Sequence, residues 1–174
     1  VAHLPVAAPT ATVATATVAP SPLSPASTIV TPTTALPTPI TPFIGREHEL
    51  IQIHTLLNDP GCRLLTLVGP GGIGKTRLAL AAAQNLAWKE PKFPDGVFFV
   101  PLADVVTPDR LAMTIAGVVQ FTLYRRDEEP LQQLIHYLAD KRLLLVLDNF
   151  EHLVTSAPQV TTLLTQAPGV KVLT

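Results

Sequence analysis

The chain has 174 residues, a formal net charge of −1 and 14% charged residues, whereas roughly 25% is usual for a globular protein. The shortage is local, because residues 1–42 contain no Asp, Glu, Lys or Arg. The Lys and Arg residues elsewhere form no basic cluster, which argues against direct contact with nucleic acid. No apolar run approaches the roughly 20 residues of a membrane span, so we expect no membrane contact.

Residues 1–42 have the composition of a linker. They are rich in Pro, Thr and Ala, and frequent prolines block helices and sheet ladders while favouring extended polyproline II backbone. We therefore predict a disordered Pro/Thr/Ala-rich linker over 1–42 and a folded domain over 43–174. A docking ligand of the PxxP type at Pro22–Pro25 is the alternative interpretation. Since the chain begins with Val1 and ends within an apolar run, we expect it to be part of a longer protein.

From residue 43 onwards, short apolar runs alternate with segments of helical periodicity. In the first helix, Leu50, Ile53 and Leu57 fall on one face. Ser156 and Gln159 have the spacing of a capping box, which predicts the start of the last helix. In chain order we expect helix 47–58, strand 63–68, helix 75–88, strand 97–100, helix 108–120, helix 130–140, strand 143–147, helix 156–166 and strand 170–173.

A glycine-rich octapeptide follows the strand expected at 63–68. It matches the pattern G-x-x-x-x-G-K-[ST] at every fixed position, in the strand-turn-helix context that the pattern requires. Glycines let the backbone curl until successive N–H groups point at one anion, and the helix N-terminus adds partial positive charge. Lys75 is expected to reach the β and γ phosphates of a nucleotide, and the Thr76 hydroxyl to bind Mg²⁺. The predicted phosphate-binding residues are Gly69, Pro70, Gly71, Gly72, Ile73, Gly74, Lys75, Thr76 and the following Arg77.

A second motif is the aliphatic strand 143–147 with Asp148 at its end. Parallel strands place their carboxyl ends at the ligand crevice of an open α/β sheet, so Asp148 is expected to face Thr76 and share the Mg²⁺ site. Asn149 follows, and its amide cannot take a proton from an attacking water. Glu151 is the candidate for that task, with a solvated surface carboxylate as the alternative. If the domain is an active enzyme, its predicted catalytic residues are Lys75, Asp148 and Glu151.

Strands separated by helices predict a parallel sheet with right-handed crossovers. Combined with the phosphate loop, this pattern predicts the α/β class, specifically a three-layer α/β/α P-loop NTPase domain with a mostly parallel sheet. The disordered linker precedes this domain.

Three motifs in this order resemble those of one family of signal-transduction proteins. The sequences FIGRE at 43–47, GPGGIGKT at 69–76 and LLLVLDNFEHL at 143–153 look like those of STAND ATPases, a class related to AAA+ and NB-ARC proteins. The specific likeness is to bacterial members found in transcriptional regulators of the LuxR and AfsR or SARP types. In that family a sensor, a helical lid and a winged helix often follow, and this sequence ends before them.

The resemblance also implies roles for individual residues. Ile44, Gly45 and Arg46 would lie beside the adenine or ribose, the glycine-rich loop would surround the phosphates, and Asp148 would lie at the Mg²⁺ site. From the sequence alone, the alternative interpretation of Arg46 and Glu47 is a helix start that carries solvated charges.

The motifs and the resemblance together predict an ATP- or ADP-binding switch domain of a larger cytoplasmic regulator, with Mg²⁺ and with slow or no hydrolysis. Protein partners or self-association are expected through domains outside this sequence. An active P-loop ATPase or small-molecule kinase is one alternative, and a non-catalytic interaction scaffold is another. A GTPase is disfavoured because the sequence contains no N-K-x-D element for guanine recognition.

Overall fold

The computed structural model describes residues 36–38, 40–89, 92–124 and 127–174, so the linker predicted over 1–42 lies mostly outside the described residues. Within these ranges no helix has the length and apolarity needed to cross a membrane. The helices are α1 (Glu47–Asn58), α2 (Lys75–Lys89), α3 (Pro108–Val118), α4 (Pro130–Leu138), the 3₁₀ helix η1 (Phe150–Ser156) and α5 (Ala157–Gln166). The strands are β1 (Leu64–Leu65), β2 (Val97–Pro101), β3 (Leu144–Asp148) and β4 (Lys171–Leu173).

The four strands form one parallel sheet in the order β1-β4-β3-β2. In the centre of the sheet, Leu145 of β3 is paired with Phe98 of β2 on one side and with Val172 of β4 on the other. A helix lies in every connection between consecutive strands, as parallel pairing requires. The predicted α/β fold with a parallel sheet is therefore confirmed.

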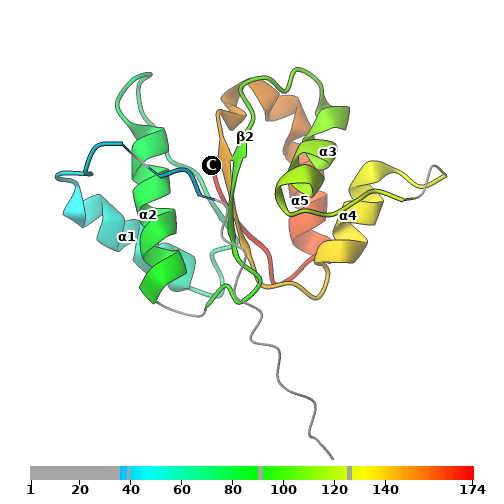
Figure 1. Cartoon of the computed structure of the whole chain (residues 1–174), viewed down its shortest axis with the longest axis horizontal. Helices are drawn as coiled ribbons and strands as arrows, with labels where there is room; N and C mark the ends of the chain where they lie inside the picture. The colour runs from blue at the N-terminus through cyan, green and yellow to red at the C-terminus, as the bar shows by residue number, and fades with distance from the viewer. Residues whose placement is uncertain (1–35, 39, 90–91, 125–126) are drawn as a thin grey trace, which may run out of the picture. The chain divides into compact units, whose positions relative to one another are not determined.

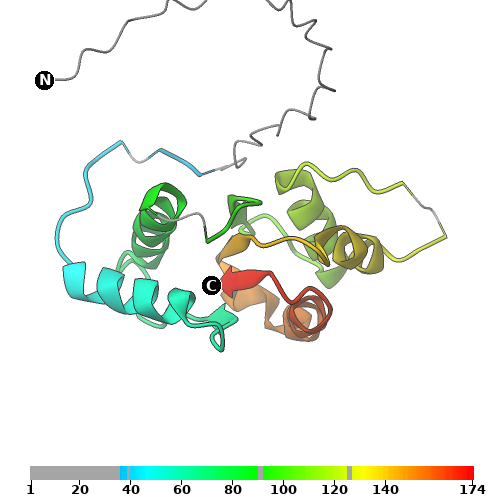
Figure 2. The same cartoon turned by 90° about the horizontal axis from the view of Figure 1, so that it is seen from below.

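Helices cover both faces of this sheet. Figure 1 shows α1 and α2 on one side and α3, α4 and α5 on the other, and the view in Figure 2 shows the same three layers. The central strand explains this arrangement, because residues 144–147 are all buried. Leu145 and Leu147 pack in the cluster with α3, α4 and α5, whereas Leu144 and Val146 pack in the cluster with α1 and α2. A strand that is buried on both faces needs such a continuous aliphatic sequence.

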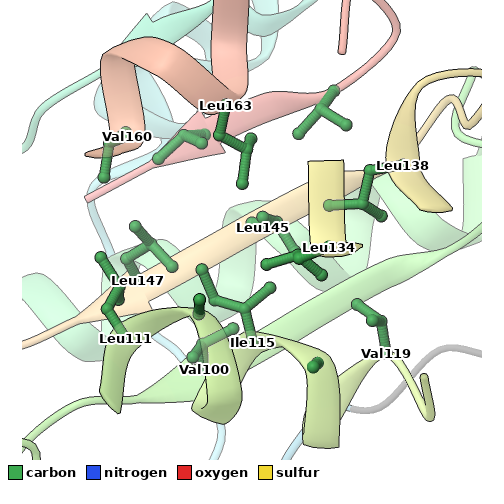
Figure 3. Close-up of a cluster of buried hydrophobic side chains, with 14 of the residues drawn as sticks. Val100, Leu111, Ile115, Val119, Leu134, Leu138, Leu145, Leu147, Val160 and Leu163 are labelled. Atoms are coloured by element: carbon green, nitrogen blue, oxygen red, sulfur yellow. The ribbon is translucent and has the colours of Figure 1, made fainter. Parts of the chain in front are cut away.

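The larger core lies between the sheet and the helices α3, α4 and α5. In Figure 3, Leu111 and Ile115 from α3 and Leu134 from α4 surround Leu145 and Leu147 of β3. Burying one such side chain contributes roughly 1.5–3 kcal/mol relative to leaving it exposed. This packing holds β3 in place and fixes the carboxyl end of the strand, where Asp148 lies.

A smaller core joins α1 and α2 to the opposite face. Ile53 and Leu57 from α1 contribute to it, together with Ala82, Ala83 and Leu86 from α2. The C-terminal end of α1 is also tied to its surroundings, because two lysines donate hydrogen bonds to its terminal carbonyl groups. Lys171 Nζ lies 2.9 Å from the Leu57 carbonyl oxygen, and Lys92 Nζ lies 2.7 Å from that of Asn58.

Some local predictions need correction. Of the strand predicted over 63–68, β1 comprises only Leu64–Leu65, although backbone hydrogen bonds to residues 172–174 continue from Arg63 to Leu67 before the chain turns into the glycine-rich loop. The capping box predicted from Ser156 and Gln159 is wrong. Ser156 has helical φ and ψ and makes no side-chain cap. The reason is that η1 runs directly into α5, so no free helix start exists at that position. Helices α3 and α4 each end two residues earlier than predicted.

Candidate functional site

The glycine-rich loop lies between β1 and α2, at the edge of the sheet where β3 also ends. This edge brings together Thr76 at the start of α2 and Asp148 at the end of β3. The Thr76 hydroxyl donates a hydrogen bond of 2.6 Å to Oδ1 of Asp148, across 72 positions in sequence. The two residues predicted to bind Mg²⁺ are therefore direct neighbours in the fold.

Two glycines give the loop its shape. Gly72 has a φ of 75° and Gly74 a φ of 91°, which L side chains rarely adopt. No heavy atom lies within 4 Å of the position that a Cβ would occupy at either residue, so conformation rather than space requires glycine there. The first amides of α2 follow directly, and first-turn amides have no acceptor within their helix. Loop and helix start therefore offer N–H donors to an anion.

Lys75 lies folded over the loop that precedes it. Its Nζ donates to the carbonyl oxygen of Gly69 at 3.0 Å and to that of Pro70 at 3.4 Å. Both acceptors are neutral carbonyl groups, so these bonds lack the Coulomb attraction between opposite charges that an anionic phosphate would add. A phosphate in the loop would therefore compete well for the Lys75 ammonium group.

Arg46 connects the FIGRE motif to the glycine-rich loop. Its guanidinium donates to the Ile73 carbonyl oxygen at 2.8 Å. Gly45 and Arg46 have φ values of 80° and 60°, and the left-handed conformation costs an L residue roughly 1–2 kcal/mol. The hydrogen bond to the loop helps to offset this cost. Ile44 is 86% exposed, and its predicted position beside the adenine or ribose stays a prediction.

Two polar residues follow Asp148 along the chain. Asn149 has a left-handed backbone with a φ of 61°, which Asn tolerates better than most residues. Glu151 lies in the first turn of η1 and is exposed. Both residues line the cavity over the loop. Asp148 and Glu151 are therefore the two carboxylates among the described residues that line this cavity.

A cavity of about 930 Å³ lies over the loop and the carboxyl ends of β1, β3 and β4. Pockets for small molecules have volumes of roughly 300–1,000 Å³. Part of the lining is apolar and comes from residues that sequence reasoning missed. The period of α5 could mark Val160 as inward-facing, but no local signal indicates that it lines a site. These apolar lining residues include Leu64, Val68, Val154, Val160 and Val172.

Within the described part of the chain, Arg77 is one of the predicted binding residues that do not line the cavity, together with Ile44, Gly45, Arg46, Pro70 and Ile73. Its guanidinium donates to the Thr41 hydroxyl at 2.9 Å and to the Pro42 carbonyl oxygen at 3.0 Å. The Arg77 side chain therefore contacts the segment before α1.

The chemistry of the donors fits a nucleoside diphosphate or triphosphate with Mg²⁺. The Thr76 hydroxyl and the Asp148 carboxylate are hard oxygen ligands, which Mg²⁺ prefers. These two residues would hold the ion, and it would neutralise phosphate charge when bound. The loop amides and Lys75 would hold the phosphates themselves.

Several curated proteins resemble this chain, among them the following three. An uncharacterized protein of Mycobacterium tuberculosis is 34% identical over 136 residues, which cover 78% of this chain and 33% of the relative. A candidate HTH-type transcriptional regulator of the same species is 36% identical over 112 residues, covering 64% of this chain and 12% of the relative. A nucleotide-binding leucine-rich repeat (NLR)-like protein of Hyaloscypha variabilis is 31% identical over 119 residues, with coverages of 64% and 12%. This chain thus spans a third or less of the length of these relatives.

A solved structure and a family model complete the comparison. The ORC2 protein of Aeropyrum pernix, in complexes with ADPNP and ADP, matches with a TM-score of 0.54 at 20% identity, over 84% of this chain and 44% of that chain. At this identity the likeness concerns the fold. Residues 42–173, which include the glycine-rich loop and Asp148, match the AAA ATPase domain model. The parallel sheet, the geometry of the loop and this match agree that the chain belongs to the AAA ATPase domain family.

Proposed function

We propose that this domain binds ADP or ATP together with Mg²⁺ and acts as a nucleotide-dependent switch in a larger regulator. The observation that carries the proposal is the direct contact between Thr76 and Asp148 beside a loop with two glycines of positive φ. Membership of the AAA ATPase domain family supports nucleotide binding. The names of two relatives, an HTH-type regulator and an NLR-like protein, support a regulatory context, as does the resemblance to STAND ATPases.

Different residues of the site bind the phosphates and the Mg²⁺ ion. The amides of the loop and of the first turn of α2 bind the phosphates, with Lys75 exchanging two carbonyl acceptors for phosphate oxygens. Thr76 and Asp148 orient the Mg²⁺ ion. Arg46 holds the Ile73 carbonyl and so keeps the apex of the loop in one conformation. Binding therefore needs little rearrangement of the main chain.

Hydrolysis would need a base or an orienting group for the attacking water. Asn149 follows Asp148 and cannot accept a proton, and Glu151 is an exposed carboxylate two residues further on. We therefore expect turnover to be slow, with binding and release as the functional events. Because Glu151 lines the cavity, an active ATPase is the second candidate function.

Titration with a fluorescent ADP analogue in the presence of Mg²⁺ tests the proposal. Lys75→Ala should weaken binding by about 10- to 100-fold, because it removes a charge-assisted hydrogen bond of roughly 1.5–3 kcal/mol. Arg110→Ala is the matched control, since it also removes one positive charge, from an exposed residue of α3 on the other side of the sheet. It should bind as the unaltered chain does.

Equal binding by Lys75→Ala and the unaltered chain would overturn the proposal. Phosphate release under saturating ATP separates the two candidate functions. Fast release that is lost in Glu151→Gln would favour the active ATPase, whereas slow release that this substitution leaves unchanged would favour the switch.

A further inference from the structure

The segment that precedes α1 runs along α2. Gln84 Nε2 donates to the Pro37 carbonyl oxygen at 3.3 Å. Two turns earlier in α2, Arg77 donates to the Thr41 carbonyl oxygen at 3.3 Å, to its hydroxyl at 2.9 Å and to the Pro42 carbonyl oxygen at 3.0 Å. Figure 1 shows this blue segment crossing α2. We call residues 36–43, apart from residue 39, the strap.

The order of these contacts gives the direction of the strap across α2: Pro37 lies beside Gln84, Thr41 lies beside Arg77, and the backbone bends at residues 40–41. From residue 77 to residue 84 a helix rises about 10 Å, at about 1.5 Å per residue. The four residue-to-residue steps from Pro37 to Thr41 can reach at most about 13 Å, at about 3.3 Å per step. The strap therefore has the length to bridge both donors.

Apolar contacts hold the two ends of the strap. Leu36 and Phe43 are both half-buried, and both pack against the smaller core formed by α1 and α2. Hydrogen bonds to the exposed backbone of the strap would be weak alone, because water competes for the same groups. Together with two apolar anchors, they fix the path of the strap over α2.

The carboxyl end of the strap is joined to the phosphate loop at two points. Arg77 directly follows Thr76, the proposed Mg²⁺ ligand, and it holds Thr41 and Pro42. Arg46, three residues after the strap, holds the Ile73 carbonyl at the apex of the loop. A shift of the loop or of the first turn of α2 would therefore alter the hydrogen bonds of Arg46 and of Arg77.

We infer that the strap is a docked element that transmits the state of the phosphate loop to the chain preceding it. Nucleotide binding strengthens its docking on α2, and undocking weakens nucleotide binding by the same factor, as thermodynamic linkage requires. The docking stands on the contacts above, whereas the coupling also rests on the proposed nucleotide binding. The preceding polypeptide would thereby be held close to the domain when nucleotide is bound.

Cleavage by chymotrypsin after Phe43 measures the docking. Tyr124, which is 77% exposed on the other side of the sheet, provides an internal reference site in the same molecule. Without nucleotide, Arg77→Lys should speed cleavage at Phe43 about fivefold relative to Tyr124, because lysine keeps the charge but cannot reach several acceptors with a planar fork. Gln84→Ala should speed it about twofold, whereas the control Arg110→Ala should change nothing. Unchanged cleavage at Phe43 in both strap variants would overturn the docking.

Adding Mg-ADP measures the coupling. In the unaltered chain, saturating Mg-ADP should slow cleavage at Phe43 several-fold and leave cleavage at Tyr124 unchanged. Gln84→Ala should reduce both this protection and ADP affinity, although Gln84 lies about three turns from the loop. ADP binding without any protection of Phe43 would overturn the coupling alone. No ADP binding by the unaltered chain would overturn the proposed function and the coupling together, and the nucleotide-free comparison would still decide the docking.

Discussion

At the scale of single residues, Gly74 shows most clearly that the conformation of the loop requires glycine. Its φ of 91° lies outside the region that an L residue adopts easily, whereas Gly71 three positions earlier has no positive φ. Neither position has a heavy atom within 4 Å of an added Cβ. The two glycines therefore differ in backbone conformation and not in the space around them.

Substitution by alanine should separate the two positions. Gly74→Ala should lower the free energy of unfolding by about 1–2 kcal/mol, because alanine is strained at that φ. Gly71→Ala should stay within about 0.5 kcal/mol of the unaltered chain. Urea denaturation without nucleotide measures both values, and equal stabilities for the two variants would contradict the role given to the φ of Gly74.

The position of the loop between a strand and a helix, and that of Asp148 at a strand end, were predictable because each depends on a short stretch of sequence. Lys75 and Thr76 are defined by local spacing, and Asp148 by its position after an aliphatic strand. The contacts of Arg77, in contrast, could not be predicted from local spacing. Its guanidinium contacts Thr41 and Pro42, and no pattern in the sequence marks that pairing. Contacts between distant segments depend on the packing of whole elements, which local spacing does not encode.

At the scale of elements, the turn between α5 and β4 packs against the turn between α4 and β3. A Cβ added at Gly169 would lie 2.2 Å from the Lys141 carbonyl oxygen, which is much closer than atoms can approach. Gly117, near the end of α3, is exposed and has no heavy atom within 4 Å of an added Cβ. These two glycines therefore predict opposite effects of the same substitution.

Gly169→Ala should destabilise the fold by about 1–3 kcal/mol, since backbone must move to relieve the overlap. Gly117→Ala should stabilise it by about 0.5–1 kcal/mol, since alanine favours a helix over glycine. Thermal unfolding of both variants checks the pair. A Gly169→Ala chain as stable as the unaltered one would show that the two turns do not pack as closely as described.

The helices were the elements that the sequence predicted best, because apolar periodicity is a property of each segment. Leu50, Ile53 and Leu57 place α1 without reference to any neighbour. The edge strand and the last helix start were not predictable in this way. The length of β1 depends on how far it pairs with β4, and the cap expected at Ser156 depends on whether a helix precedes it. Both depend on tertiary structure.

At the scale of the whole molecule, β3 belongs to both cores. Alternate side chains of this strand pack against α1 and α2 on one face and against α3, α4 and α5 on the other. Its carboxyl end supplies Asp148, and α2 on one face supplies Thr76. The candidate site therefore forms only where the layers of the fold meet, which explains why residues 72 positions apart are in contact.

The proposed function requires that main-chain amides of the loop donate hydrogen bonds to phosphate. The most direct test is a titration with Mg-ADP in which ¹H–¹⁵N NMR records the chemical shifts of these amides. The amides of Gly72, Gly74 and Lys75 should move downfield as they donate to phosphate oxygens. The amide of Gly169, which lies in the turn between α5 and β4, should stay in place and serves as the internal control. Unmoved loop amides at saturating Mg-ADP would contradict phosphate binding by this loop.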